Sequence, residues 1–262
     1  MIRRRLDREM IRRGLVRTRE DALRLIENRQ VLVQGAFAVK PTTLIARDAS
    51  LHVLPSEHRF VSRGGDKLEG ALEDLGVSVE GKRCLDAGAG TGGFTDCLLA
   101  RGASHVTAVD VGYGDFDWRL RNDPRVTLWE RTNLRRAEGD SLGGPFGLVV
   151  ADLSFISLKM VLDPLVAAGS DADFLLMVKP QFEAPRDEVG EGGIVRDPAV
   201  WGRALRAVAA ALTERGLRMS AVVPSRVLGA RGNQEFFVLA RIEGPAGSPE
   251  ELITGAVDAA AR

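Results

Sequence analysis

The sequence predicts an α/β fold, a mostly parallel sheet with helices on both faces, preceded by a small α+β module. From residue 61 onward, apolar runs of strand length alternate with segments of helical periodicity, the pattern that such a sheet requires. The 262 residues, 45% of them hydrophobic, suffice for one large and one small domain. We therefore expect the small domain at residues 1–55, a linker at 56–61 and the large domain at 62–262.

The elements of the large domain follow from apolar runs bounded by turn residues. Seven strands are expected, at residues 83–86, 106–110, 126–130, 148–152, 174–178, 217–223 and 235–241. Helices are expected at residues 94–101, 158–168, 201–214 and 250–262, the second of them despite Pro164. This alternation predicts a Rossmann-like sheet, in which ligands bind beyond the carboxyl ends of the parallel strands.

The small module begins with two predicted helices. Apolar side chains recur at helical spacing between residues 6 and 11, and Gly14 is a natural end for that helix. Thr18 is a candidate cap for the second helix. A hairpin with its turn at Gln34-Gly35 and a further strand at residues 51–54 complete the predicted module.

The net charge of zero is unevenly distributed along the chain. Residues 1–60 hold 13 Lys and Arg against 7 Asp and Glu, whereas the remainder holds 23 against 29. Eight arginines lie within the first 19 residues, opposed only by Asp7 and Glu9. A solvated helical face is the simpler explanation, but so many planar guanidinium groups favour contacts with nucleic-acid phosphates and bases.

Several stretches of the small module match the sequence pattern of a known RNA-binding family. They are Arg5-Leu6-Asp7, Arg12-Arg13-Gly14-Leu15, Thr18-Arg19, Ala22, Leu25-Ile26, Val31-Leu32-Val33-Gln34-Gly35 and Pro41. On these residues the module resembles the S4 RNA-binding domain, whose two helices present basic side chains to structured RNA. The resemblance implies RNA contacts by Arg3, Arg4, Arg5, Arg17, Arg19 and Lys40. In the large domain, Arg63 and Arg135 are candidates to extend this RNA surface.

Other features restrict the class of protein. The two cysteines, Cys84 and Cys97, are expected to be buried free thiols of a reducing compartment. The three histidines are scattered, so no metal site is expected. No run of about 18 apolar residues and no signal-peptide pattern occurs. We therefore expect a cytoplasmic protein that does not enter membranes. We also expect a monomer, on which none of these features bears.

A glycine-rich stretch at residues 85–94 follows the first predicted strand of the large domain. It satisfies the pattern G-x-G-x-x-G, which occurs in the binding loops for several nucleotide cofactors. Asp86 lies two residues before the first glycine, where a carboxylate would repel a dinucleotide's pyrophosphate but attract the cationic amino and sulfonium groups of S-adenosylmethionine. We therefore expect S-adenosylmethionine rather than a nicotinamide cofactor. The candidate binding residues of this loop are Asp86, Gly88, Gly90, Thr91, Gly92, Gly93 and Phe94.

Polar residues at later strand ends complete the expected cofactor site. Asp110 ends the next strand, where an acid can accept both ribose hydroxyls. Asn133 follows the third strand, at a position that commonly faces the adenine edge and more often holds an acid. Asp152 ends the fourth strand and is expected near the sulfonium. Lys179 follows the fifth strand, Glu235 opens the last, and Lys67 precedes the first.

Seven stretches of the large domain together resemble one methyltransferase family. They are SRGGDKLEGAL, CLDAGAGTGGFT, DVGYG, RNDPRV, ERTN, VVADLSFISL and VKPQFE. Within them and before the last strand, Lys67, Asp152, Lys179 and Glu235 match the K-D-K-E tetrad of FtsJ-like ribose 2′-O-methyltransferases of the class I fold. With its S4-like module, the chain resembles the TlyA family over nearly its whole length.

The resemblance implies methylation of cytidine 2′-hydroxyls in 16S rRNA, 23S rRNA or both, within assembled 30S and 50S subunits. The segments before Leu6 and after Glu250 favour both targets. Lys179 is then the base or the direct partner of the hydroxyl, if its pKa falls toward neutrality. Asp152 would orient Lys179, and Lys67 and Glu235 would position both the ribose and Lys179.

Two alternatives from other classes remain open. One is a non-catalytic RNA-binding factor of ribosome assembly, against which the intact glycine loop and tetrad argue. The other is a membrane-active hemolysin, a second label of the same family, against which the absence of an apolar span argues. Phe60, Phe155 and Tyr113 are candidates to stack on a nucleobase, although we expect each to be buried.

Overall fold

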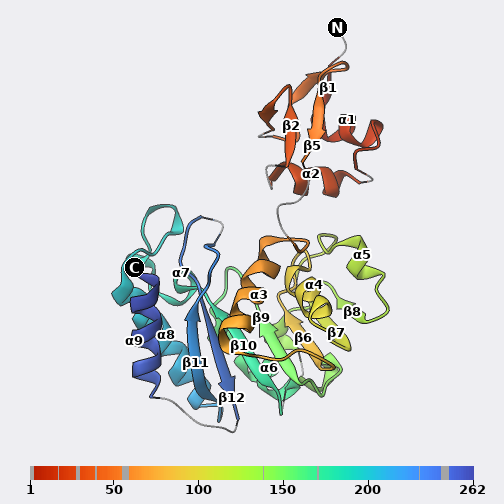
Figure 1. Cartoon of the computed structure of the whole chain (residues 1–262). Coiled ribbons are helices and arrows are strands. Elements are labelled where there is room, and N and C mark those ends of the chain that lie inside the picture. The colour runs from red at the N-terminus through yellow and green to blue at the C-terminus, as the bar shows by residue number, and fades with distance from the viewer. Residues whose placement is uncertain are drawn as a thin grey trace. The chain divides into compact units, whose positions relative to one another are not determined.

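The chain divides into two compact units, Met1–Arg59 and Phe60–Arg262, each with its own hydrophobic core (Figure 1). The computed structural model describes residues 3–16, 18–27, 30–38, 40–54, 59–137, 139–169, 171–229, 231–242 and 248–262. Half of the linker predicted at 56–61, residues 56–58, falls outside these ranges.

The large unit contains a seven-stranded sheet in the order β11-β12-β10-β9-β6-β7-β8. The strands are β6 (Arg83–Ala87), β7 (His105–Val109), β8 (Val126–Trp129), β9 (Leu148–Ala151), β10 (Asp173–Val178), β11 (Arg218–Pro224) and β12 (Phe236–Arg241). The five strands from β10 to β8 are parallel, whereas β12 runs antiparallel to both of its neighbours. The predicted α/β fold with a mostly parallel sheet is therefore confirmed.

Helices cover both faces of this sheet. They are α3 (Arg63–Leu75), α4 (Gly93–Ala100), α5 (Trp118–Arg121), α6 (Leu162–Ala168), α7 (Pro180–Glu183), α8 (Pro198–Thr213) and α9 (Pro249–Ala260). Alternate side chains of β10 enter different cores: Leu176 packs with residues of α6, α8 and α9, and Leu175 with residues of α3 and α4. Because successive strand side chains point to opposite faces, a strand buried on both sides must be apolar throughout.

Helix α3 was not predicted, although it carries Lys67. Ser62 caps its first turn by accepting a hydrogen bond from the Gly64 N–H at 3.3 Å, and Gly76 ends it in the left-handed conformation. Its glycines obscure the helical pattern in the sequence. One of them, Gly65, is needed for packing, because a Cβ atom there would lie 2.4 Å from Phe60.

The segment predicted as one helix at 158–168 is broken in two. A 3₁₀ helix spans Leu158–Met160, and α6 begins only at Leu162. Pro164 consequently lies in the first turn of α6, where a missing N–H removes no helical hydrogen bond.

The small unit combines two helices with short strands. They are β1 (Arg3–Arg5), α1 (Leu6–Arg12), α2 (Arg19–Glu27), β2 (Val31–Val33), β3 (Ala36–Phe37), β4 (Leu44–Ala46) and β5 (Leu51–Val53). The predicted helices, the hairpin β2–β3 and the strand β5 are confirmed, whereas β1 and β4 were not predicted. Among the described residues of the whole chain, no helix has the length and apolarity needed to cross a membrane.

Candidate active site

Three charged residues of the predicted tetrad meet at one edge of the large sheet. In the antiparallel pair β10–β12, Val178 lies opposite Phe236, so the next residues along the ladder are Lys179 and Glu235. Asp152 directly follows β9, the parallel neighbour of β10 on its other side. The carboxyl ends of β9 and β10 and the amino end of β12 therefore converge, as the sequence predicts.

The tetrad forms two ion pairs. Lys67, from α3, places its Nζ 2.5 Å from Glu235 Oε2, and both side chains are buried. Lys179 pairs with Asp152, and its Nζ also donates to Ser154 Oγ at 3.2 Å. Removing ion pairs from water costs free energy that their attraction only partly offsets, so two such pairs side by side contribute little to stability. Their arrangement instead presents a fixed amine at the sheet edge.

The glycine-rich loop packs closely on the end of β9. Gly88 adopts a φ of +86°, and a Cβ atom there would lie 2.5 Å from the backbone oxygen of Asp152. The carbonyl of Thr91 accepts a hydrogen bond from the Asp117 N–H at 3.1 Å. Gly90, with a φ of +52°, is exposed, and a Cβ atom there would meet nothing within 4 Å. The backbone at Gly90 is therefore open to a ligand.

The last glycines of the loop are required by packing within the protein. A Cβ atom at Gly92 would lie 2.6 Å from Leu120, and one at Gly93 would lie 2.2 Å from Ser62 Oγ. The ring of Phe94 is buried in the core between α3, α4 and the sheet. The close approach that the glycine pattern predicts is thus partly an approach of the loop to α3 and α5.

Asp86 has an unusual environment beneath this loop. Its side chain is fully buried, and Thr95 Oγ1 donates to its Oδ2 at 2.6 Å. Its Oδ1 has no hydrogen-bond partner among the described residues. Burial raises the pKa of Asp86 to about 7, and the neighbouring charges of Asp152 and Asp110 act in the same direction. A buried acceptor of this kind favours a cationic donor.

Asp110 braces the glycine-rich loop. Its Oδ2 accepts the Gly90 N–H at 2.8 Å, and its Oδ1 accepts the Gly112 N–H at 2.6 Å. Val111, which the sequence analysis did not single out, is 72% exposed although it is apolar. Its signal in the sequence is only its place, directly after an acid that ends a strand.

Asn133 lies at the start of a 3₁₀ helix, Leu134–Arg136. Its Oδ1 accepts the Arg135 N–H at 3.1 Å and so caps that helix. The side chains of Asn133 and Arg135 are both exposed. Arg63, at the first turn of α3, is also exposed.

Two buried acids hold four arginines of the small unit, of which Arg5 and Arg19 are RNA-binding candidates. Asp7 accepts hydrogen bonds from Arg5 at 2.7 Å and from Arg19 at 3.1 Å. Glu9 binds Arg12 and Arg13, whose hydrogen bonds lower the pKa of Glu9 to about 2. Asp7 and Glu9 therefore not only oppose the positive charge of the arginines but also hold four of them in place.

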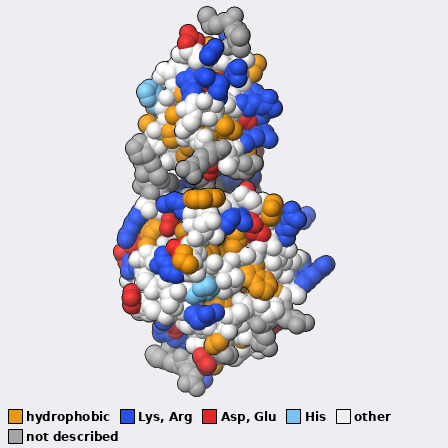
Figure 2. All heavy atoms as spheres, turned by 90° about the vertical axis from the view of Figure 1, so that its right-hand side faces the viewer, with side chains coloured by type: hydrophobic (Ala, Val, Ile, Leu, Met, Phe, Trp, Pro, Cys, Tyr) orange, Lys and Arg blue, Asp and Glu red, His pale blue; other side chains and the backbone are white. Residues whose placement is uncertain are grey.

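The remaining candidates of the small unit are surface residues. Arg3, Arg4 and Lys40 are exposed, whereas Arg17 lies outside the described residues. Figure 2 shows several Lys and Arg side chains close together on one face of this unit. The ion pairs with Asp7 leave the side chains of Arg5 and Arg19 partly accessible to solvent.

The candidate stacking residues differ in exposure. Phe60 is 4% exposed, so its expected burial is confirmed. The same expectation is wrong for Tyr113 and Phe155, which are 64% and 90% exposed. Phe155 lies three residues after Asp152 and has a φ of +64°. An exposed aromatic ring with strained backbone beside a charged site indicates a binding role.

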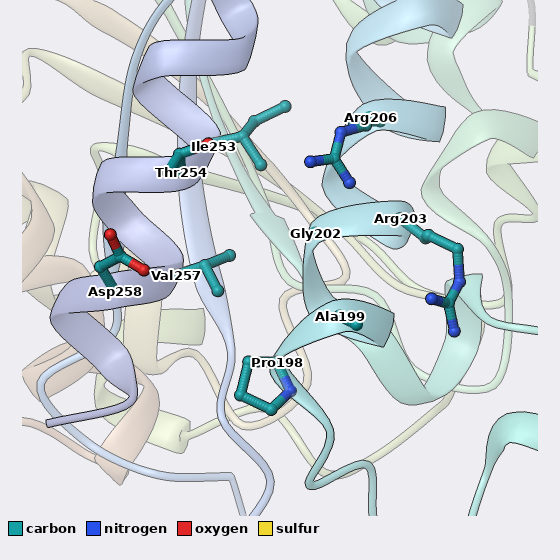
Figure 3. A pocket seen from close by; sticks show the side chains of 9 residues that line it. All are labelled: Pro198, Ala199, Gly202, Arg203, Arg206, Ile253, Thr254, Val257 and Asp258. Atoms are coloured by element: carbon teal, nitrogen blue, oxygen red, sulfur yellow. The ribbon is translucent and has the colours of Figure 1, made fainter.

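A separate hollow of about 300 Å³ lies between α8 and α9 (Figure 3). None of the predicted site residues lines it. Its two arginines are already paired, Arg203 with Glu188 and Arg206 with Glu250. Among the described residues, no group of three or more His, Cys, Asp or Glu side chains is arranged to bind a metal ion.

Comparison with known proteins agrees with this geometry. Residues 60–242 match the family of FtsJ-like methyltransferases. The chain is 50% identical over 241 residues to the 16S/23S rRNA (cytidine-2′-O)-methyltransferase TlyA of Mycobacterium tuberculosis. The aligned region covers 91% of this chain and 90% of that protein. It is 32% identical over 242 residues to the 23S rRNA (cytidine-2′-O)-methyltransferase TlyA of Campylobacter jejuni, covering 84% and 92%.

The fold also matches a solved structure. A candidate hemolysin from Streptococcus thermophilus superposes with a TM-score of 0.76 and 37% sequence identity. The superposition covers 99% of this chain and 96% of that one, so it includes both units.

Proposed function

The chain belongs to the TlyA group of FtsJ-like, S-adenosylmethionine-dependent methyltransferases, and we propose that it methylates cytidine 2′-hydroxyls in ribosomal RNA. The observation that carries this proposal is the pair Lys179–Asp152 beside the pair Lys67–Glu235, at the sheet edge next to the glycine-rich loop. The names of the two TlyA relatives supply the target, a cytidine of ribosomal RNA.

The cofactor site is proposed to use the acids that end β6 and β7. S-adenosylmethionine, when bound, supplies a methyl group on a positively charged sulfur. The free, buried Oδ1 of Asp86 is suited to accept a hydrogen bond from the amino group of that cofactor. Each oxygen of Asp110 accepts one backbone N–H and has a further lone pair for a ribose hydroxyl. Val111 offers an exposed apolar surface to the adenine of the cofactor. Asn133 is the candidate polar residue facing the edge of the adenine.

The chemistry is proposed to centre on Lys179. A ribose 2′-hydroxyl is a weak nucleophile and must be held in line with the methyl group, with its oxygen roughly 3 Å away. The amine of Lys179 would take the hydroxyl proton or hold the oxygen by a hydrogen bond. Asp152 fixes the direction of that amine, and the buried pair Lys67–Glu235 would position the ribose.

Phe155 is proposed to contact the target nucleobase. Its ring is almost fully exposed and lies on the turn after β9, close in sequence to Asp152. Turning a nucleotide out of a stacked RNA structure costs a few kcal/mol. Stacking on an aromatic ring contributes about 1–3 kcal/mol per base and so offsets part of that cost.

The small unit is proposed to act as the RNA-docking domain. We assign residues 1–55 to an S4-like domain and residues 62–262 to the methyltransferase domain. The docking residues would be Arg3, Arg4, Arg5, Arg17, Arg19 and Lys40, with Arg63 and Arg135 on the large domain. Their support is the exposure of the described members of this set and the positive charge of the small unit.

Both ribosomal subunits are proposed as targets. The relative from M. tuberculosis, named for 16S and 23S rRNA, is 50% identical to the chain, against 32% for the relative named for 23S rRNA alone. The substrates would be assembled 30S and 50S subunits, reached by a monomeric enzyme in the cytoplasm.

Methyl transfer from radiolabelled S-adenosylmethionine to 30S and 50S subunits lacking the modification tests this proposal. The wild type should label one or both RNAs at a site that resists alkaline cleavage, because a methylated 2′-oxygen cannot attack the adjacent phosphate. Lys179→Ala should bind the donor but transfer no label. Absence of label with both subunits, despite measured donor binding by the wild type, would reject the ribosomal target. Absence of donor binding would reject the enzyme assignment.

A further inference from the structure

Glu183 is a buried acid that the proposed tetrad does not include. It is the last residue of α7, the short helix that begins directly after Lys179. Its side chain is only 2% exposed. Because β9 and β10 are parallel neighbours, α7 and the turn that follows β9 leave the sheet at the same edge.

Both oxygens of Glu183 accept hydrogen bonds from the turn after β9. Ser157 Oγ donates to Oε2 at 2.6 Å, and the Leu158 N–H donates to Oε1 at 2.6 Å. Lys159 places its Nζ 3.7 Å from Oε2. Burial raises the pKa of Glu183, and these donors oppose that rise. A carboxylate with both oxygens engaged by consecutive residues restricts the conformation of that turn.

The same turn is joined to the residues after β10 at two other points. At its beginning, Ser154 accepts the hydrogen bond from Lys179 at 3.2 Å. In its middle, the ring of Phe155 lies 5.5 Å from the ring of Phe182. Glu183 forms the third connection, at the end of the turn. Residues 154–158 are thus held along their length by residues 179–183.

The backbone of this turn needs such support. Phe155 has a φ of +64°, in the left-handed region, which is unfavourable for a residue with a side chain. Its ring is 90% exposed and gains little from burial. Strained residues of this kind persist only where neighbouring contacts determine the backbone.

We propose that Glu183 is a positioning residue for RNA methylation. By fixing the turn 154–158, it keeps Phe155 turned outward toward the target nucleobase. This inference rests on the proposed function, in which Phe155 contacts the base and Lys179 the hydroxyl. Glu183 itself touches neither.

A double-mutant cycle on the full chain tests this inference. Glu183→Ala should lower kcat/KM for the ribosomal subunit by about 10-fold to 100-fold, because a displacement of about 1 Å at a reacting site has an effect of that size. The affinity for S-adenosylmethionine should change less than about twofold, because neither Glu183 nor its partners line the proposed donor site. In the Phe155→Ala variant, adding Glu183→Ala should cause little further loss of kcat/KM, because Glu183 acts through Phe155.

A conservative variant separates positioning from stability. In Glu183→Gln, the amide oxygen can still accept the Leu158 N–H while the NH₂ group donates to Ser157 Oγ. This variant should recover most of the wild-type kcat/KM. Ser157→Ala removes one connection but leaves the hydrogen bond from the Leu158 N–H, and it should show a smaller loss of the same kind. Glu250→Ala, which removes a surface partner of Arg206, is the matched control and should be unaffected.

Two results would overturn the inference while leaving the proposed function intact. One is a full multiplication of the separate losses in the double variant. The other is a parallel loss of donor affinity and RNA methylation in Glu183→Ala that Glu183→Gln does not recover. If Glu183→Ala does not fold, the cycle of Ser157→Ala with Phe155→Ala gives the same decision. A wild type that binds the donor but methylates neither subunit would instead reject the proposed function.

Discussion

Acidic and basic side chains are paired in both units, but the buried partner differs. In the small unit, Glu9 is fully buried while the side chain of its partner Arg12 remains 38% exposed. In the large unit, the side chain of Lys179 is 9% exposed while that of its partner Asp152 is 22% exposed. The Arg12–Glu9 pair of the small unit therefore presents its basic group to solvent, whereas the Lys179–Asp152 pair of the large unit withdraws it.

This difference matches the two tasks proposed for the units. An exposed guanidinium with its acid behind it can reach phosphates of a large RNA from many directions, and its planar fork binds them bidentately. A buried amine with its acid beside it can meet only an atom delivered into the site. Choice of arginine in one unit and lysine in the other follows, because only lysine can become a neutral base in a protein.

The largest effect is expected when the type of basic residue is changed in an ion pair of each unit, from lysine to arginine in the large unit and from arginine to lysine in the small one. Lys179→Arg keeps the positive charge beside Asp152 but cannot accept a proton and has a different shape. We expect kcat on the ribosomal subunit to fall by about 10²-fold to 10⁴-fold, the usual contribution of a positioned acid or base. Arg5→Lys in the small unit, where Arg5 pairs with the buried Asp7 and is an RNA-binding candidate, should change kcat less than about threefold, because an ammonium still binds phosphate as a point charge.

Both variants are compared by initial rates at saturating donor, with donor affinity measured separately by calorimetry. A Lys179→Arg enzyme that keeps more than about a tenth of the wild-type kcat would show that residue 179 acts only as a cation. Proton transfer through Lys179 would then be wrong, although its role as a hydrogen-bond partner of the hydroxyl could stand.

Asp86 offers a second test, because its buried Oδ1 has no hydrogen-bond partner among the described residues. Its pKa of about 7 means that near and below pH 7 the carboxyl is increasingly protonated. Binding of a cationic amino group favours the ionised form, so donor affinity should be about tenfold weaker at pH 6 than at pH 8. Asp86→Asn should bind more weakly than wild type at pH 8 and show no such pH dependence.

The same raised pKa has an opposite effect on the free protein. A carboxyl whose pKa is raised on folding stabilises the fold fully only below its unfolded pKa, and that contribution is lost as pH rises through about 7.

The control for the donor-binding prediction is calorimetry with methylthioadenosine, which lacks the amino-acid part of the donor. A step near pH 7 for this fragment as large as that for the donor would exclude Asp86 as the partner of the amino group.

The strand ends of the site could be predicted from the sequence, but the contacts between loops could not. Asp152 and Lys179 end apolar runs that are recognisable as parallel strands, and parallel strands end at one edge. Glu183 and Ser157 form their contact across 26 residues of chain, and no local pattern marks it. Phe155 was expected to be buried, because aromatic side chains usually are; only the turn geometry shows its exposure.

Acid pH distinguishes the buried acids of the small unit from those of the large one. Hydrogen bonds from Arg12 and Arg13 hold the pKa of Glu9 at about 2, far below its unfolded value. The stability that Glu9 contributes is therefore present above about pH 4.5 and is lost as pH falls toward 2. Glu9→Gln should speed hydrogen exchange of α1 at pH 7, and this difference from wild type should shrink below pH 3.

Hydrogen exchange followed by mass spectrometry on the full chain resolves the peptides of α1 from those of the large unit. Asp48→Asn, at an exposed position of the small unit, is the control and should leave exchange unchanged at both pH values. Equal effects of Glu9→Gln at pH 7 and pH 3 would mean that the carboxylate charge does not stabilise the helix.

The smallest expected effect concerns an exposed arginine that forms no ion pair with another described residue. Arg4 lies on β1 with its side chain in solvent. If it binds one phosphate, Arg4→Ala should weaken RNA binding at low salt and reduce the slope of log K against log salt concentration by about 1. Arg215→Ala, which removes a partner of Asp163 in the large unit, is the control and should leave the slope unchanged. A change in kcat at saturating RNA in Arg4→Ala, with the slope unaltered, would contradict the division between docking and chemistry, because a docking contact shared by ground state and transition state lowers KM alone.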